Sequence, residues 1–583
     1  MAQVETRVES PSPDVSVRRR TIARLWLDAV ERNRPEPAYL AERDGAWEPV
    51  SWPEAARAVD ELAHGLLALG VRKGDAFALF ANTSVEWVLF DFALGLIGAV
   101  GVPVYMNSST KDAQYVVEHS EAVGVLCEGE EERGKVAPLG LPHVLTFADL
   151  DGLRARGREH AREHPQAVVD AANAVEEDDL FTYIYTSGTT GPPKACMIRH
   201  RNYYDMVAVI DDIDDFVMGR DTMLLYLPLA HNFGRCMHLA GPYVGYTLAF
   251  VRDPLKLSDA LPLVRPTVLP SVPRVFEKVH TAVLAKFREA TGIKRRLIDW
   301  ALRVGKDVSE RRQRGEPVPR AQAIKHRLAA RLVYAKVHER LGGRVRLCIS
   351  GGAPLAKEII EFFHTLDVPI LEGYGLTECT TAATVNRPSR FRFGTVGPAL
   401  PKVELRLGGD GELLIRSPTV FKGYYKDQEA TRAVLDDDGW LRSGDIASID
   451  DDGFVTITDR KKDILVTAGG KNVAPQNLEN DLKTHAEVSQ ALVVGDKRPF
   501  VAALVTLDED WARTLSDEQK RVRVQEIVDA VNAERSRFEQ IKKFTILPRD
   551  FSAADGEVTP TLKLKRSVCQ EHFAAEIEAL YRS

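Results

Sequence analysis

Residues 84–127 read SVEWVLFDFALGLIGAVGVPVYMNSSTKDAQYVVEHSEAVGVLC and determine the class of fold. The first part, 84–97, has the length and apolar content of a buried helix, and a short apolar strand is expected at 101–105. A second helix over 113–119 leads into a second strand over 124–127. Helices that alternate with short, almost continuously apolar strands are typical of parallel α/β layers.

Similar strands are expected further along the chain, at 224–227, 247–250 and 345–349. A polar cluster at 459–463 then separates this region from a new α+β segment, and we place the main domain boundary there. The predicted parts are a disordered tail, a large α/β domain and a small α+β domain, at 1–20, 21–458 and 459–583.

The region before this boundary is β-rich from residue 398 onwards. Apolar and polar residues alternate in 403–407 and 412–416, as in half-buried strands. The glycine- and aspartate-rich segments 408–411 and 450–453 are typical of hairpin turns.

The composition is that of a folded protein. The 583 residues are 44% hydrophobic and carry a net charge of −7, which is too apolar and too weakly charged for disorder. A general nucleic-acid binder would be basic. Six widely spaced cysteines without a C-x-x-C pair favour buried thiols in a reducing compartment over disulfides or a zinc site.

No targeting or membrane-spanning segment is expected. Residues 1–20 are polar and lack the apolar core of a secretory signal. The longest apolar stretch, 88–106, is interrupted by Asp91, glycines and Pro103, whereas a membrane span needs about 20 apolar residues. The sequence therefore predicts a soluble, cytoplasmic protein.

One segment departs from the acidic balance of the chain. Residues 281–350 contain 18 Lys and Arg against 6 Asp and Glu in a helical pattern that is broken at 314–317. Two interpretations stay open: a solvated, charged helical face, or a surface that attracts anionic lipid or phosphate-rich ligands.

The strongest local signal is 183–194, which reads YIYTSGTTGPPK. A β-prone run enters a loop of glycines and hydroxyl residues that ends in Lys194. Such a loop presents backbone N–H groups and hydroxyls to polyphosphate oxygens, and the lysine adds positive charge. Pro193 stands where a Walker A loop would have its second glycine, and the motifs of serine hydrolases, zinc proteases and kinases are absent.

Two glycine-rich turns follow downstream. Residues 350–355, SGGAPL, come after a strand and open a helix over 356–364, at the sheet edge where α/β proteins bind ligands. Residues 372–378, EGYGLTE, place Tyr374 between glycines, where its ring can lie against a purine. Thr377 and Glu378 then supply a hydroxyl and a carboxylate of the kind that meets phosphate and Mg²⁺.

The order of these and further motifs resembles that of the adenylate-forming superfamily, which includes acyl-CoA synthetases, peptide-synthetase adenylation domains and luciferases. The resemblance covers about residues 25–567. Its motifs are 185–194, 226–231, 373–378, 440–445, 459–464 and Lys563. The basic segment and the ending 559–566 are most similar to long-chain fatty acyl-CoA synthetases. The resemblance implies an N-terminal acyl- and ATP-binding domain of α/β layers with a distorted β-barrel, and a small, mobile α+β lid.

The resemblance also implies roles for individual residues. Lys563 would bridge the fatty carboxylate and the α-phosphate, and Glu378 would hold Mg²⁺ with Thr186. His231 would shape the carboxylate site, and Phe233 next to it would either gate the acyl tunnel or serve for packing. Asp445 would accept hydrogen bonds from the ribose, and Arg460 would contact ribose or phosphate. The remaining nucleotide-binding residues would be Ser187, Gly188, Thr189, Thr190, Gly191, Lys194 and Thr377 at the phosphates, and Gly352, Ala353, Tyr374 and Gly375 around the base.

The lid is implied to rotate between two half-reactions. Lys462 would be its pivot, and Gly469, Gly470 and Lys471 would line a thiol tunnel in the second state. Only 20 residues follow Lys563, too few for a fused carrier domain, so free CoA is the expected acceptor.

The expected reaction is the activation of a long-chain fatty acid with ATP, followed by transfer to CoA. Two alternatives stay open: a fatty acyl-AMP ligase that loads a separate carrier protein, and a non-catalytic relative that binds acyl groups or nucleotide. Peripheral association of the basic helices with the inner membrane surface is a further hypothesis. The natural acid and the oligomeric state are left undetermined.

Overall fold

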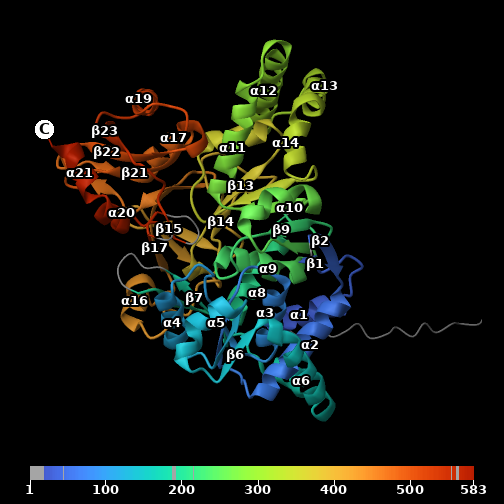
Figure 1. Ribbon diagram of the computed structural model, residues 1–583. Helices are drawn as coiled ribbons and strands as arrows, with labels where there is room; N and C mark the ends of the chain where they lie inside the picture. Colours follow the sequence, from blue (N-terminus) through green and yellow to red (C-terminus); the bar gives the residue numbers. More distant parts are fainter. Residues whose placement is uncertain are drawn as a thin grey trace, which may run out of the picture.

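The computed structural model describes residues 19–43, 45–186, 192–213, 216–552, 555–559 and 564–582 (Figure 1). Most of the predicted tail lies outside these residues. Arg20, at its end, is held by ion pairs to Glu177 at 2.8 Å and Asp205 at 2.9 Å, so the ordered packing begins before the first helix.

The first of two large sheets confirms the parallel α/β prediction. All its neighbouring strands are parallel except the last pair, which forms an antiparallel hairpin. The strands in spatial order are β6 (His143–Thr146), β5 (Gly124–Cys127), β3 (Ala76–Phe80), β4 (Val100–Pro103), β7 (Leu180–Thr186) and β8 (Lys194–Arg199). The strand predicted at 124–127 is confirmed, and the one predicted at 101–105 begins and ends earlier.

The helix predicted at 84–97 is α3 (Val85–Leu96). The side chain of Ser84 accepts a hydrogen bond from the Trp87 N–H and caps the first turn, which leaves fewer unsatisfied donors there. Because α3 is buried almost all round, its sequence is apolar without a clear period, as for a helix between core layers.

The second large sheet supplies the edge at which the candidate site lies. Its inner strands are parallel to one another. The order is β14 (Thr384–Val385), β13 (Ile370–Tyr374), β12 (Leu347–Ser350), β11 (Val268–Ser271), β9 (Thr222–Leu225), β10 (Thr247–Phe250), β1 (Tyr39–Arg43) and β2 (Ala46–Val50). The strand predicted at 247–250 is confirmed, whereas those predicted at 224–227 and 345–349 are each displaced by one or two residues.

The β-rich region forms a four-stranded antiparallel sheet, and both predicted hairpin turns are confirmed. Its strands are β15 (Glu404–Leu407), β16 (Glu412–Arg416), β17 (Leu441–Ile449) and β18 (Val455–Arg460). A single bridge from Cys196 to Tyr424 links β8 to this region, and a second bridge, Pro398 to Phe454, lies within it.

Helices cover the two large sheets. Two of them, α12 and α13, stand out from the body (Figure 1). The α-helices before residue 435, besides α3, are α1 (Ile22–Glu31), α2 (Trp52–Leu69), α4 (Thr110–His119), α5 (Glu130–Val136), α6 (Leu150–Glu163), α7 (Ala167–Ala174), α8 (His200–Ala208), α9 (Asn232–Val244), α10 (Leu257–Val264), α11 (Pro273–Arg288), α12 (Gly292–Gln313), α13 (Arg320–Ala329), α14 (Ala335–Arg340), α15 (Lys357–Thr365) and α16 (Gln428–Val434). The predicted break at 314–317 separates α12 from α13.

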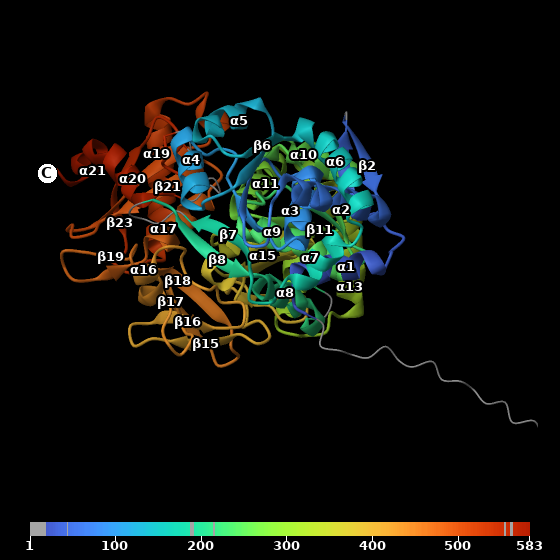
Figure 2. The same cartoon turned by 90° about the horizontal axis from the view of Figure 1, so that it is seen from below.

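The C-terminal segment has its own sheet and apolar core, and lies beside α11 and the β-rich region (Figures 1 and 2). Its strands are β19 (Leu465–Val466), β20 (Asn472–Val473), β21 (Val488–Val494), β22 (Val501–Leu507) and β23 (Ile541–Ile546). Its helices are α17 (Pro475–Lys483), α18 (Glu509–Ala512), α19 (Asp517–Ala533), α20 (Arg566–His572) and α21 (Ala574–Tyr581).

Polar side chains join α11 to this segment. Both terminal nitrogens of Arg274 donate to Ser489, one to its carbonyl and one to its hydroxyl, each over 2.7 Å. Lys483 donates to Glu277 over 3.3 Å. This orientation of the small domain therefore rests in part on a few charged contacts.

Two predictions from composition are also testable. All six cysteines are free and buried, as predicted. In the part of the chain that the structure describes, no helix combines the length and the apolar character that crossing a bilayer requires.

Candidate functional site

The site lies where the parallel strands β9, β11, β12 and β13 end at one edge of the sheet. The hydroxyls of Tyr226 and Ser271, just after β9 and at the end of β11, are 2.5 Å apart. The next two strands end in the turns 350–355 and 372–378. Such an edge is where α/β sheets bind ligands, because the loops leave the strands there.

Tyr374 and Asp445 form the centre of the predicted nucleotide site. The Tyr374 hydroxyl donates to Oδ2 of Asp445 over 2.5 Å, and Nε of Arg460 lies 3.1 Å from Oδ1. Asp445 and Arg460 are directly paired across β17 and β18. Burial and the adjacent carboxylate raise the pKa of Tyr374, so its phenol remains a hydrogen-bond donor.

The glycines around Tyr374 are required by close packing. A Cβ on Gly375 would lie 1.8 Å from the Thr381 carbonyl oxygen, which no side chain could tolerate. Gly352, at φ +86°, adopts a conformation that glycine enters most readily. Ala353, next to it, is exposed at the same edge. Close packing therefore requires a glycine at position 375, whereas the backbone conformation favours one at position 352.

Glu378 lies in a short 3₁₀ turn (Thr377–Cys379) that the β-rich region holds in place. The Phe421 N–H donates to the Glu378 carbonyl over 2.9 Å, and the Tyr424 hydroxyl donates to its Oε1 over 2.6 Å. Burial and the Glu378 carboxylate raise the pKa of Tyr424, which keeps the phenol protonated. The sequence analysis did not single out Tyr424, although it lies within the predicted β-rich segment.

Thr186 and Lys194 face each other at the end of the β7–β8 hairpin, one on each side of the predicted phosphate loop in the sequence. Nζ of Lys194 lies 3.3 Å from Asp427, a partner that the sequence analysis missed, and 5.2 Å from the centre of the Tyr424 ring. Lys194 and Glu378 therefore both contact the Tyr424 side chain, Lys194 at the ring and Glu378 at the hydroxyl. The loop residues Ser187, Gly188, Thr189, Thr190 and Gly191 lie outside the described residues.

The donor set near Glu378 suits Mg²⁺. Glu378 and Thr186 both lie beside Cys196, where burial, followed by the Glu378 carboxylate, raises the pKa of the thiol. One carboxylate and one hydroxyl leave room for phosphate oxygens and water, as Mg²⁺ prefers. Across the described ranges, no group of three His, Cys, Asp or Glu side chains could hold a metal ion.

His231 begins helix α9, which links the predicted acid site to the Glu378 turn. Its Nδ1 accepts a hydrogen bond from the Phe233 N–H over 3.2 Å. Asn232 donates to the Thr377 carbonyl over 3.4 Å, and the Thr381 hydroxyl donates back to the Asn232 carbonyl over 3.2 Å. Asn232 is a third residue missed from the sequence, because its partners Thr377 and Thr381 are about 150 residues away.

Phe233 packs against the turn after β12. A Cβ added to Gly351 would lie 3.4 Å from the Phe233 ring, so the ring and the glycine backbone are in contact. Phe233 is buried, and the contact is consistent with the packing role that the sequence analysis left open beside gating.

The predicted hinge and thiol-tunnel residues lie on the surface. Lys462, Gly469, Gly470 and Lys471 are all exposed, and Nζ of Lys471 lies 5.9 Å from the centre of the Phe538 ring in the same small domain. Lys563 lies outside the described residues. Arg566, three positions later, pairs with Glu479 and Asp463 beside the predicted hinge.

Comparison with known proteins agrees with this geometry. The model of the AMP-binding enzyme family matches residues 27–425, and that of the AMP-binding enzyme C-terminal domain matches residues 462–583. The chain belongs to the AMP-binding enzyme family.

Relatives of this AMP-binding enzyme match nearly end to end. It is 39% identical to the long-chain-fatty-acid–CoA ligase FadD15 of Mycobacterium bovis, over 94% of this chain and 96% of the relative. FadD15 of Mycobacterium tuberculosis is 38% identical over the same shares. The long-chain-fatty-acid–CoA ligase ACSBG2 of Rattus norvegicus is 30% identical over 97% of this chain and 93% of the relative.

Solved structures share the fold of this AMP-binding enzyme. The adenylation domain of the Mycobacterium chelonae carboxylate reductase superposes with a TM-score of 0.76 at 23% identity, covering 98% of this chain and 92% of that domain. The adenylation domain of the Segniliparus rugosus carboxylic acid reductase, in complex with AMP and a co-purified carboxylic acid, gives 0.72 at 21% identity and covers 96% and 94%. These neighbours confirm the predicted fold class.

Proposed function

We propose that the protein is an AMP-forming long-chain fatty acid–CoA ligase. It activates the acid with ATP as an acyl-adenylate, releases pyrophosphate, and transfers the acyl group to CoA with release of AMP. The observation that carries the proposal is that Arg460 interacts with Tyr374, Asp445 and Glu378, in a chain that matches long-chain-fatty-acid–CoA ligases over almost its whole length.

In the first half-reaction two anions must meet, so the chain has to supply positive charge and hydrogen-bond donors. Tyr374 lies against the adenine beside Gly352 and Ala353, with Gly375 and Thr377 completing the turn. Asp445 accepts the ribose hydroxyls, oriented by Arg460 and by the Tyr374 phenol. Lys194 and the hydroxyls and N–H groups of 186–191 bind the phosphates that depart, and His231 borders the fatty carboxylate.

Glu378 and Thr186 are the residues that would hold Mg²⁺. When bound, the ion neutralises phosphate charge and so favours attack of the carboxylate on the α-phosphorus. The Tyr424 hydrogen bond fixes the position of the Glu378 carboxylate.

The small domain, which we place at 459–583, acts as the lid. Lys563 neutralises charge on the carboxylate and the α-phosphate in the first half-reaction. Rotation at Lys462 would then remove it and bring Gly469, Gly470 and Lys471 to the thiol. The loop 469–471 is exposed, as expected if it does not yet line a thiol tunnel. This exposure supports our assignment of the present lid orientation to adenylate formation.

Lys563→Ala tests the two-state lid. Adenylation, measured by the release of pyrophosphate, should be lost, whereas thioester formation from supplied acyl-AMP should persist. Lys565→Ala, which removes a neighbouring lysine of the same segment, should retain both activities. Equal loss of both half-reactions in Lys563→Ala would contradict the proposal.

A carrier-loading acyl-AMP ligase is the second candidate, because the resemblance to the adenylate-forming superfamily leaves the acyl acceptor, CoA or a carrier-protein thiol, to be decided by experiment. Consumption of CoA with release of AMP supports the ligase. Accumulation of acyl-AMP that CoA does not discharge would favour the carrier-dependent alternative.

The basic excess at 281–350 supports a location at the inner membrane surface, held peripherally. Sedimentation of the full chain with vesicles of anionic lipid, compared with neutral lipid, tests this location. Equal recovery in the supernatant with both lipids would argue against it.

A further inference from the structure

We infer that the outer face of helix α13 and the turn that follows it is a docking surface for anionic phospholipid bilayers. The inference deepens the proposed function and rests on it in part, since a long-chain acid partitions into membranes. It identifies which of the many basic residues contact the lipid. The face is a stripe of exposed apolar side chains with unpaired cations on both sides.

The apolar stripe consists of Ile324, Leu328 and Leu332. Their side chains are 66%, 49% and 44% exposed, and they are spaced by four residues. Residues four apart lie above one another on a helix, so the three form one line along the outside of α13 and the π-helical turn Ala330–Tyr334. Exposed large apolar residues in one line, rather than scattered singly, indicate an interaction surface.

Cations flank this line. On a helical projection of α13, Arg320 and Lys325 fall on opposite sides of the line through Ile324 and Leu328. Arg331 follows in the π-helical turn and Lys336 in α14. All four are exposed and make no ion pair with any residue that the structure describes. On the neighbouring helix α12 some cations are neutralised, Arg295 by Asp299 and Arg311 by Asp307, whereas Lys294, Arg296 and Arg303 are exposed and also lack an ion pair among the described residues.

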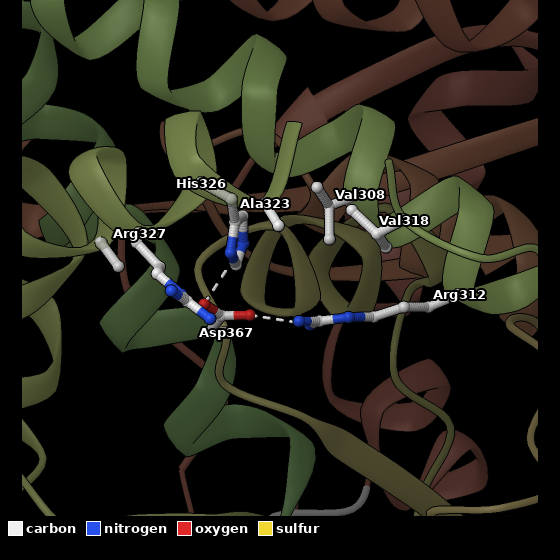
Figure 3. Close-up of a pocket in the computed structure, with 8 residues that line it drawn as sticks. Val308, Arg312, Val318, Ala323, His326, Arg327 and Asp367 are labelled. Atoms are coloured by element: carbon white, nitrogen blue, oxygen red, sulfur yellow. Dashed lines mark hydrogen bonds and ion pairs between the residues drawn. The ribbon is translucent and has the colours of Figure 1, made fainter. Parts of the chain in front are cut away.

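The opposite face of α13 is fixed to the body, so the stripe cannot turn inward. Ala329 and Val333 are buried against α12, and Tyr334 donates to the Ala301 carbonyl over 2.6 Å. His326 lies 3.3 Å from Asp367, which also accepts from Arg312 over 2.8 Å (Figure 3).

Arg327 also lines the cavity that these charged groups border, between α12 and α13. We therefore exclude it from the docking face. The charged groups inside the cavity already include an acidic partner for Arg312 and His326. The four outward cations have no acidic partner among the described residues. This favours an external anionic surface as their partner.

An amphipathic helix of this pattern suits the interface of a bilayer. The apolar side chains enter the boundary between headgroups and acyl chains, and the cations meet anionic headgroups. Helices α12 and α13 project from the body (Figure 1), and the stripe side chains are exposed, so both features favour access by a membrane surface.

Sedimentation with vesicles of phosphatidylcholine alone, or mixed with phosphatidylglycerol, tests the surface on the full chain. The wild type should sediment with the mixed vesicles only. The double variant Arg331→Gln/Leu332→Ser should lower the partition coefficient about tenfold, because a cation and an apolar side chain near the bilayer are both lost. Adding Lys325→Gln and Leu328→Ser should abolish binding, and high salt should weaken the wild type.

The matched control is Arg521→Gln/Val522→Ser on α19. It also removes one exposed cation and one adjacent exposed apolar residue, 51% exposed in the case of Val522, but in the small domain. It should bind like the wild type. Unchanged binding of the quadruple variant, or equal loss in the control, would overturn the inference. A dimer that dissociates in the quadruple variant, without vesicle binding by the wild type, would assign the stripe to a second copy instead.

Activity separates this inference from the proposed function. With fatty acid delivered on albumin, the variants should form AMP at the wild-type rate, since none of these residues belongs to the site. Vesicle binding without AMP formation in the wild type would refute the ligase and leave the docking surface standing. AMP formation without vesicle binding would support the ligase and refute the docking surface.

Discussion

The Tyr374 hydroxyl donates to the Asp445 carboxylate over 2.5 Å, although 71 positions separate the two residues. The contact joins the end of a parallel strand in the large sheet to the antiparallel β17. Arg460 holds the other oxygen of the same carboxylate. One acidic side chain therefore fixes the β-rich region against the sheet edge and, in our proposal, also receives the ribose.

Asp445→Ala should raise the KM for ATP about a hundredfold, because two hydrogen bonds to a charged acceptor are worth about 3 kcal/mol together. ATP–pyrophosphate exchange at varied ATP gives the value. Asp451→Ala, at an exposed hairpin turn, is the matched control and should behave like the wild type. An unchanged KM in Asp445→Ala would remove the residue from the nucleotide site.

Glu378→Gln should raise the Mg²⁺ concentration that half-saturates adenylation by about tenfold or more, because a neutral amide oxygen is a much weaker ligand for a hard cation. A magnesium titration of pyrophosphate release measures the effect. Glu429→Gln, an exposed substitution on α16, should leave the titration in place. If both variants titrate alike, Glu378 does not bind the ion.

Much of this site could be predicted from the sequence, because the relevant signals are local. Gly373 and Gly375 lie directly on either side of Tyr374, and an apolar strand precedes each of the turns 350–355 and 372–378. Tyr424, Asn232 and Arg274 could not be found in this way. Tyr424 reaches Glu378 across 46 positions and Arg274 reaches Ser489 across 215, so each role depends on how the sheets and the small domain pack together.

Strand boundaries were less predictable than strand existence. The strand expected at 224–227 is β9 at Thr222–Leu225, and its last two expected residues instead begin the loop to His231. Residues 224–225, in the strand, and 226–227, in the loop, are all apolar and buried, so hydrophobicity alone does not locate the end of the strand. Hydrogen bonding to β10 and β11 sets the end of the strand.

Arg274→Ala should slow adenylation about tenfold and spare thioester formation from supplied acyl-AMP. The substitution removes two charge-assisted hydrogen bonds to Ser489, which help to hold the lid in the present orientation. Separate assays of the two half-reactions provide the test. Lys278→Ala, an exposed cation one turn along α11, is the matched control. Equal slowing of both half-reactions would show that Arg274 supports folding rather than the lid equilibrium.

Glu372→Gln should change how stability depends on pH. Burial raises the pKa of Glu372 to about 8, while its Oε1 accepts the Leu355 N–H over 3.1 Å. In the unfolded chain a glutamate loses its proton near pH 4.3, so between about pH 4.3 and 8 the folded state binds more protons than the unfolded state. The stability of the wild type therefore falls as pH rises through this window.

Glutamine keeps the hydrogen-bond acceptor but cannot ionise. The free energy of unfolding of Glu372→Gln, relative to that of the wild type, should therefore increase by about 3 kcal/mol between pH 5 and pH 8. Denaturant unfolding at both pH values measures the difference, with Glu358→Gln on the exposed face of α15 as the control. A constant difference across the window would mean that Glu372 is already ionised in the folded protein, and that the turn carrying Leu355 does not depend on its proton.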